Sequence, residues 1–149
     1  MEAREATYDV RPFTIAWHTA AYRLWDACDG VGLCEADSRE AIDAYLRRNP
    51  GMSFVAVAGQ KLVGTVLCGH DGRRGYIHHL AVAPGWRRRG VGRSLVRRSL
   101  ATLAEAGIRR CHGFVFEDNP EGLAFWEAGG WTLRTELQLI SKDVPQADP

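Results

Sequence analysis

The sequence predicts an α/β or α+β fold in which helices cover both faces of a mixed, mostly antiparallel sheet of about six to seven strands. Two observations carry this prediction. Residues 53–84, "SFVAVAGQKLVGTVLCGHDGRRGYIHHLAVAP", contain three apolar runs separated by two short turns, which is typical of consecutive antiparallel strands. Residues 78–116 then follow the order strand, helix, strand, and such a crossover makes its two strands parallel.

The first third of the chain is predicted to supply one strand and two helices. Residues 6–10 suit a short strand, and a helical stretch opens at Pro12 and runs to about Ala27. After a glycine-punctuated loop, Asp37 is placed to cap the next helix, with Glu40 three residues later completing a capping box. The tripeptide "NPG" that follows ends this helix.

The last third alternates helices and strands. A helix is predicted over residues 90–106, and Gly107 stands where a helix C-terminus favours glycine. Three further elements are expected in the order strand, helix, strand: residues 108–116, 119–129 and 131–141. With 149 residues the chain is expected to form one domain over 1–149, with a flexible tail at 143–149.

The formal net charge of +1 hides a strong asymmetry. Residues 73–110 hold ten arginines and one acidic residue, Glu105, whereas the first 43 residues carry nine carboxylates. An anionic ligand is therefore expected in the middle of the chain. The four cysteines show neither a CxxC pair nor zinc-ligand spacing, so no metal is expected. With no apolar run near ~20 residues and no signal-peptide core, the sequence indicates a cytoplasmic protein without a membrane partner.

The densest motif is "LAVAPGWRRRGVGRSL", residues 80–95, in which three arginines precede a Gly-x-Gly at the start of a predicted helix. Glycines at a helix start let backbone N–H groups approach an anion, and the arginines attract it. The pattern is not a P-loop, and it is not GxGxxG because Leu95 occupies the third glycine position. A glycine-containing helix start with solvated arginines is the alternative. The place after a strand and before a parallel strand favours a phosphate site.

The same stretch resembles the acyl-CoA-binding motif of the GNAT superfamily of N-acetyltransferases. The family pattern [Q/R]-x-x-G-x-[G/A] is matched by Arg87, Gly90 and Gly92. A second stretch, "DNPEGLAFWEAGGW", resembles the family pattern N-x-x-A-x-x-[F/L]-Y-x-x-x-G-[F/Y] at the family's spacing. The predicted element order also agrees with the family fold, so the resemblance covers nearly the whole chain. It implies an enzyme that transfers the acetyl group of acetyl-CoA to a primary amine.

The resemblance also implies which residues bind acetyl-CoA. The pantetheine arm would hydrogen-bond the backbone of Leu80, Ala81 and Val82. The pyrophosphate would be held by seven consecutive residues: Arg87, Arg88, Arg89, Gly90, Val91, Gly92 and Arg93. Asn119 would bind the pantetheine from the opposite side, with Phe125 nearby.

Acetyl transfer also needs a base for the ammonium proton. Alternation along "GYIHHLAV" places Tyr76, His78, Leu80 and Val82 on one face of the strand and His79 on the other. Some members of the family use histidines on this strand, so His78 is the first candidate base, and Tyr76 would assist through a water. Glu117 is a second candidate for base or substrate anchor. A histidine packed in the sheet with both nitrogens satisfied remains the alternative for His78.

A second group must protonate the leaving thiolate. Many members of the family use a tyrosine in the second motif, and this chain has Trp126 there. An indole N–H cannot act as that acid. Tyr76, Tyr22 or a water would supply the proton, or the thiolate would leave unassisted.

The acceptor is expected beside the loop "LWDACDGVGLCEADS", where Asp26 and Asp29 would attract a cationic amine. The candidates are an aminosugar, a polyamine, an amino acid and a protein N-terminus; solvated helix ends would explain the acidic residues equally well. Two other functions stay open: a CoA-binding module without catalysis, and nucleic-acid binding. Nucleic acid is not expected, because no aromatic residues interleave with the arginines after Trp86. Homodimers are common in the family, but no feature of this chain demonstrates one.

Overall fold

The computed structural model describes residues 7–148, which divide into two compact units, one ending at Phe116 and the other beginning at Glu117. The predicted single domain over 1–149 therefore stays a prediction. Its residues 1–6 and 149 lie outside the described part.

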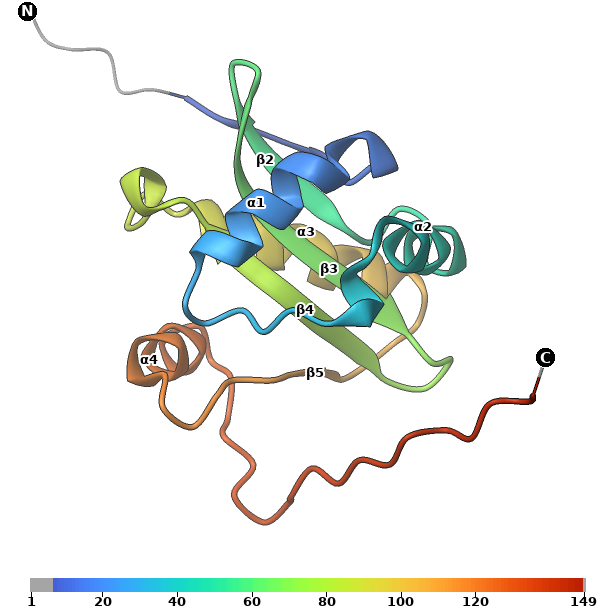
Figure 1. Ribbon diagram of the computed structural model, residues 1–149. Helices are drawn as coiled ribbons and strands as arrows, with labels where there is room; N and C mark the ends of the chain where they lie inside the picture. Colours follow the sequence, from blue (N-terminus) through green and yellow to red (C-terminus); the bar gives the residue numbers. More distant parts are fainter. Residues whose placement is uncertain (1–6, 149) are drawn as a thin grey trace, which may run out of the picture. The chain divides into compact units, whose positions relative to one another are not determined.

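The first unit is built on a mixed sheet, as the sequence predicts (Figure 1). Its order follows the chain: β1 (Asp9–Pro12), β2 (Phe54–Ala58), β3 (Lys61–His70), β4 (Gly75–Val82) and β5 (Cys111–Gly113). The first four strands pair antiparallel, and β5 pairs parallel with β4. The predicted strand over 6–10 begins at Ala6, outside the described residues, and β1 lies slightly later in the chain.

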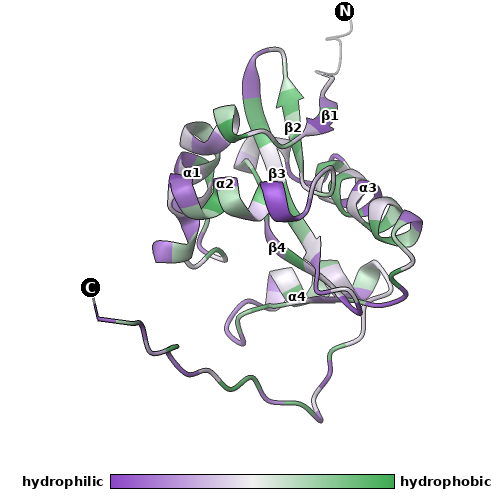
Figure 2. Cartoon of the chain, turned by 90° about the vertical axis from the view of Figure 1, so that its right-hand side faces the viewer, coloured by the Kyte–Doolittle hydropathy of each residue, from purple (hydrophilic) through white to green (hydrophobic). Residues whose placement is uncertain are grey.

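Helices cover both faces of this sheet. Figure 2 shows α1 (His18–Ala27) and α2 (Arg39–Arg48) on one side and α3 (Val91–Glu105) on the other. The helix α3 lies very close to the sheet because Gly75 has no side chain: a Cβ there would lie 2.6 Å from the Leu103 side chain. Gly107 follows α3 with a φ of +79°, which confirms its predicted role at the helix end.

The helix α2 begins one residue later than predicted. Its cap is Ser38, whose Oγ accepts a hydrogen bond from the Ala41 N–H (3.1 Å). Asp37 instead ends the short 3-10 helix η2 (Glu35–Asp37), and its carboxylate accepts from the Cys34 N–H (3.0 Å). The predicted capping box between Asp37 and Glu40 is therefore wrong.

A β-bulge interrupts β4. Between the pairs that join His78 to Leu67 and Ala81 to Thr65, β4 contains two residues, His79 and Leu80, where β3 contains one. His79 takes up a left-handed φ of +48°, which is unusual for a residue with a side chain.

The bulge changes the faces on which later side chains lie. The predicted alternation placed His78 and Val82 on one face of the strand and His79 on the other face. It is wrong, because the one extra residue of the bulge shifts the pattern. The His79 ring lies 4.7 Å from the ring of Trp25 in α1, so it faces the α1 side. Val82 pairs with Gly64, where a Cβ would touch side chains of α3, so Val82 faces α3.

The second unit contains α4 (Pro120–Ala128) and a segment without regular structure. Asn119 caps α4, and its Oδ1 accepts from the Gly122 N–H (3.0 Å). The predicted strand over 131–141 is wrong for the described residues, in which the sheet has five strands. Its alternating apolar residues suit a strand, but a strand forms only against a partner backbone, and Ile140 is 90% exposed.

Candidate functional site

Among the residues that the structure describes, no strand pairs with the second half of β4 along the edge that faces β5; we call this the open edge of β4. β5 pairs with β4 only as far as Ile77, which lies opposite Gly113, whereas β4 continues to Val82. The Ala83 N–H donates to β3 (2.8 Å), so the alternation of an antiparallel ladder directs the backbone groups of Val82 away from β3. The Val82 carbonyl accepts from Nε of Arg87 (3.1 Å). The N–H of Val82 faces the open edge.

The loop between β4 and α3, which we call the arginine loop (residues 83–90), leads from this edge to the helix start. It contains the 3-10 helix η3 (Pro84–Trp86) and positive φ angles at Arg88 (63°) and Gly90 (80°). Gly90 caps α3 without a side-chain hydrogen bond, and the first helical bond runs from the Ser94 N–H to the Gly90 carbonyl (3.0 Å). The N–H groups of the first turn therefore lack partners within the helix and favour an anion.

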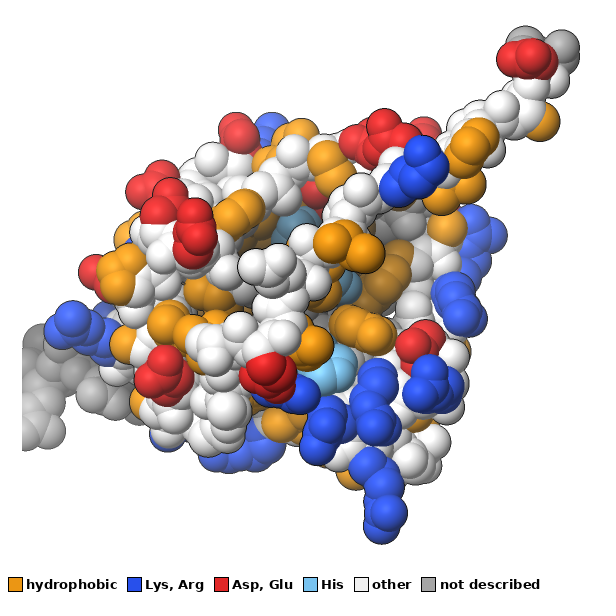
Figure 3. Space-filling view, turned by 90° about the horizontal axis from the view of Figure 1, so that it is seen from below, with side chains coloured by type: hydrophobic (Ala, Val, Ile, Leu, Met, Phe, Trp, Pro, Cys, Tyr) orange, Lys and Arg blue, Asp and Glu red, His pale blue; other side chains and the backbone are white. Residues whose placement is uncertain are grey.

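The arginine side chains of this region reach into solvent. Arg87, Arg88, Arg89 and Arg93 are all exposed, whereas Val91 and Gly92 are buried in the first turn of α3. The Arg89 guanidinium lies 4.9 Å from the centre of the Trp86 ring. Figure 3 shows Lys and Arg side chains gathered on one part of the surface in that view. Four of the ten arginines of residues 73–110 are thus exposed around the start of α3.

His78 lies just beyond the last pair of β4 with β5. Its ring stacks on Phe114 (centroids 5.6 Å apart, planes at 10°) and meets Tyr45 edge-on (6.5 Å, 78°). Neither ring nitrogen of His78 has a hydrogen-bond partner within residues 7–148. Burial lowers the pKa of His78, and His79 lowers it further, against an opposing effect of Asp37. A neutral imidazole with free nitrogens can accept a proton at neutral pH.

His79 is tied into the protein instead. Its Nε2 lies 2.6 Å from Oδ1 of the buried Asp37. The Asp37 carbonyl in turn bonds Nε2 of His18 (2.8 Å). The main-chain carbonyl of His79 accepts a hydrogen bond from Oγ1 of Thr65 (2.9 Å), and that oxygen accepts one from Nε1 of Trp25 (2.8 Å). These contacts identify His79 as a structural histidine that fixes the bulge.

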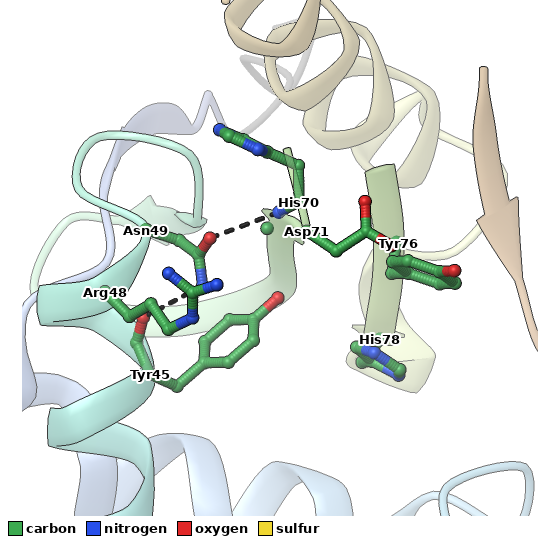
Figure 4. A pocket seen from close by; sticks show the side chains of 8 residues that line it. Tyr45, Arg48, Asn49, His70, Asp71, Tyr76 and His78 are labelled. Atoms are coloured by element: carbon green, nitrogen blue, oxygen red, sulfur yellow. Dashed lines mark hydrogen bonds between the residues drawn. The ribbon is translucent and has the colours of Figure 1, made fainter. Parts of the chain in front are cut away.

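A pocket of about 220 Å³ lies between α2 and the adjoining ends of β3 and β4 (Figure 4). We call it the α2–β4 pocket. Its lining consists of eight residues: Tyr45, Arg48, Asn49, Gly69, His70, Asp71, Tyr76 and His78. The two residues that sequence reasoning selected for proton transfer, Tyr76 and His78, thus border one cavity. The sequence did not single out Tyr45 or Arg48, although Tyr45 lies three residues after the buried Ile42 and Arg48 three residues after Tyr45.

Tyr45 contributes an unusual group to this pocket. Its hydroxyl is buried and has no hydrogen-bond partner in the part of the chain that the structure describes. Burial raises the pKa of this phenol far above its usual value, with smaller effects of Cys68 and Cys111. Figure 4 shows the hydroxyl directed toward the side on which Tyr76 and His78 lie. The group is therefore a permanent hydrogen-bond donor that the protein leaves unused.

The remaining predicted residues lie elsewhere. Asp26 at the end of α1 and Asp29 in the following loop are exposed, and neither lines the α2–β4 pocket. Glu117, Asn119 and Phe125 belong to the second unit, where Glu117 is exposed. In that unit Trp126, at the family's tyrosine position, packs against Phe125 and Trp131 (5.3 and 4.8 Å between centroids).

The four cysteines form no disulfide. Within residues 7–148 there is no group of three His, Cys, Asp or Glu side chains that could hold a metal ion. The same residues contain no helix with both the length and the apolar character needed to cross a bilayer.

A family model and similar protein sequences both place the chain in one family. The model of the acetyltransferase (GNAT) family matches residues 11–131. An acetyltransferase of Pectobacterium atrosepticum is 31% identical over 119 residues, which cover 80% of this chain and 84% of the relative.

Two solved structures are similar in fold. One is an aminoglycoside acetyltransferase from an uncultured soil metagenomic sample in complex with sisomicin, with a TM-score of 0.74 and 18% identity over 93% of this chain and 97% of that one. The other is the PaiA N-acetyltransferase from Thermoplasma acidophilum in complex with coenzyme A, with a TM-score of 0.71 and 15% identity over 86% and 91%.

Proposed function

The chain belongs to the GNAT family of acetyltransferases, and from this premise we propose that it transfers the acetyl group of acetyl-CoA to a primary amine of a small acceptor. The observation that carries the proposal is the placement of His78, a neutral histidine with free ring nitrogens, between the open edge of β4 and the α2–β4 pocket.

The open edge of β4 suits the pantetheine arm of CoA, which has amide groups that can extend a sheet. Val82 offers only its N–H there, since its carbonyl already accepts a hydrogen bond from Arg87. Leu80 lies in the bulge, one residue from the strand's return to regular pairing. Ala81 pairs with Thr65, so alternation directs its backbone toward β3, and we expect it to contribute only its small side chain.

The start of α3 suits the pyrophosphate. The unbonded N–H groups of its first turn, at Val91, Gly92 and Arg93, supply hydrogen bonds and the positive end of a 15-residue helix. The exposed guanidinium groups of Arg88 and Arg89 add attraction for a diphosphate. Roles for Asn119 and Phe125 remain predictions.

His78 serves as the base in this proposal. An aliphatic amine has a pKa near 10, so it arrives as an ammonium ion and must lose a proton before it can react. His78 takes that proton directly or through a water, and Glu117 remains a second candidate. Acetyl-CoA supplies the thioester that the neutral amine attacks, and the backbone N–H groups of Leu80 and Val82 would polarise its carbonyl.

Tyr76 is the candidate we choose for returning a proton to the leaving thiolate. It lies on β4 two residues before His78, and its ring stacks on the same Phe114 (6.5 Å, planes at 7°). A phenol can donate this proton, which the indole of Trp126 cannot. Trp126 also keeps a second function open, a CoA-binding module without catalysis.

Two measurements test the proposal. Acetyl-CoA is expected to raise the melting temperature, and a thiol-release assay over a panel of primary amines is expected to detect turnover. Stabilisation without turnover on any amine would favour the non-catalytic module. No stabilisation by acetyl-CoA would contradict the proposed function at its first step.

A further inference from the structure

The donors of the α2–β4 pocket point to the kind of acceptor it takes. Among the described residues the buried Tyr45 hydroxyl has no hydrogen-bond partner, and burial raises its pKa, so the phenol stays protonated and can donate to a ligand. Asn49 is more fully engaged: its Oδ1 accepts from the His70 N–H (3.1 Å), and one of the two N–H groups of its Nδ2 donates to the Tyr45 carbonyl (3.3 Å).

Arg48 is the second free donor. Among the described residues no carboxylate lies within 4.0 Å of its guanidinium, whereas the neighbouring Arg47 is paired with Asp43 (2.8 Å). Figure 4 shows the Arg48 side chain close to Tyr45 and Asn49 in the pocket lining. The exposed guanidinium of Arg48 and the buried phenol O–H of Tyr45 line one pocket, and both are suitable donors for a carboxylate.

The opposite side of the pocket suits an amine. Burial lowers the pKa of His78 there, and neither of its ring nitrogens has a hydrogen-bond partner within residues 7–148. Asp71 borders the pocket and is ionised at neutral pH, because the N–H groups of Arg74 and Arg73 donate to its Oδ1 (2.8 Å each) and lower its pKa. The pocket is thus cationic on the α2 side and basic or anionic on the β4 side.

We propose, on the basis of the proposed function, that the acceptor is a small amino acid whose carboxylate is bound by Tyr45 and Arg48 while its amine lies at His78. A volume of about 220 Å³ suits a molecule of that size. Arg48 also disfavours polyamines and aminosugars with several ammonium groups, because it would face like charge. Of the four acceptor classes that the sequence leaves open (aminosugar, polyamine, amino acid and protein N-terminus), the proposal selects the amino acid.

The test compares amino acids with the amines that lack their carboxylate. Thiol release from acetyl-CoA is measured with the L-amino acids and with matched decarboxylated amines, such as phenylalanine with phenethylamine, histidine with histamine and lysine with cadaverine. We expect kcat/KM to be at least tenfold higher for one or more amino acids than for their matched amines. Equal or faster turnover of every matched amine overturns the inference and leaves the proposed function standing.

Two substitutions locate the effect. Tyr45→Phe removes a hydroxyl that is unbonded in the free protein, so the melting temperature should not fall, while KM for the amino acid rises at least fivefold. Arg48→Gln should raise the same KM at least tenfold, and Arg47→Gln should not, because Arg47 lies outside the pocket. Neither pocket variant should change KM for a decarboxylated amine.

The remaining outcomes separate this inference from the proposed function. An unchanged amino-acid KM in both Tyr45→Phe and Arg48→Gln overturns the inference. Turnover of other amines but of no amino acid also overturns the inference, while the proposed acetyl transfer remains supported. If acetyl-CoA stabilises the protein but no amine of any class is turned over, the proposed function fails together with the inference.

Discussion

The Nε2 of His79 lies 2.6 Å from Oδ1 of Asp37, and this contact joins the bulge of β4 to the segment between α1 and α2. A left-handed φ at a residue with a side chain costs about 1–3 kcal/mol and persists only where the surroundings enforce it. Asp37 holds the His79 side chain, and Thr65 holds its carbonyl (2.9 Å). The bulge is therefore fixed at both its side chain and its backbone.

Asp37→Ala should destabilise the fold by about 2–4 kcal/mol, because it leaves a half-buried histidine unpaired and removes the partner of the Cys34 N–H. Urea unfolding at pH 7 measures the change. Asp43→Ala is the matched control, since Asp43 forms an exposed pair with Arg47 and should cost less than about 0.5 kcal/mol. Equal losses in the two variants would show that the His79–Asp37 contact contributes no more than a surface pair.

His78→Gln should lower kcat at least tenfold at neutral pH, because glutamine keeps a polar side chain but cannot take the ammonium proton. Acetyl-CoA affinity should persist, since the arginine loop is untouched. Steady-state kinetics and the acetyl-CoA melting shift measure the two effects. His112→Gln, on the neighbouring β5, is the control and should retain most activity. Unchanged turnover in His78→Gln would remove His78 from the mechanism.

The pH profile should carry the signature of His78. Burial and the neighbouring His79 lower its pKa below 6.5, so the base is neutral at pH 7 and becomes protonated only in more acidic solution. We expect kcat/KM to fall on the acid side at a pH below 6.5. The unfolded chain binds this proton more readily, so the same group also lowers folding stability as pH falls through and below 6.5. An acid limb that survives unchanged in His78→Gln would assign it to another group.

Local patterns in the sequence predicted much of the fold. The two hairpins from β2 to β4 and the crossover through α3 follow from apolar runs, turn residues and the positions of Gly90 and Gly107, all of which act over a few residues. The bulge at His79 does not follow from such patterns. It depends on Asp37 and Thr65, which are distant in sequence and which alternation along one strand does not include.

The candidate site shows the same division. The arginine loop and His78 could be selected from the sequence, because glycine, arginine and histidine are conspicuous at those positions. Tyr45 and Arg48 could not be selected in this way, because a tyrosine and an arginine on an amphipathic helix do not by themselves indicate a site. Only the tertiary structure places them in one pocket. Asp37 was predicted to cap α2, a role that Ser38 has instead, because the contact of Asp37 with His79 is visible only in three dimensions.

The cysteines should differ widely in reactivity. Cys34 is exposed, whereas burial raises the pKa of Cys68 to about 11 and that of Cys111 to about 12. Because the thiolate is the reactive form, a thiol reagent such as DTNB at pH 8 should label Cys34 first and leave Cys68 and Cys111 unmodified until the protein unfolds. Cys34→Ser should abolish the fast phase. A fast phase that remains in this variant would show that a buried thiol becomes accessible in the folded state.

Gly90→Asp should weaken acetyl-CoA binding at least tenfold, because it adds a carboxylate at the N-cap of α3, where the pyrophosphate is proposed to bind. Gly59→Asp in the β2–β3 turn is a close control. Both glycines have a positive φ (80° and 62°), and a Cβ at either meets nothing within 4 Å, so both variants should lose about 1 kcal/mol of stability from backbone strain alone. Only Gly90→Asp should also lose the melting shift that acetyl-CoA produces. Equal acetyl-CoA affinity in the two variants would place the pyrophosphate away from the start of α3, since the two variants add the same charge and similar strain and differ only in where they add them.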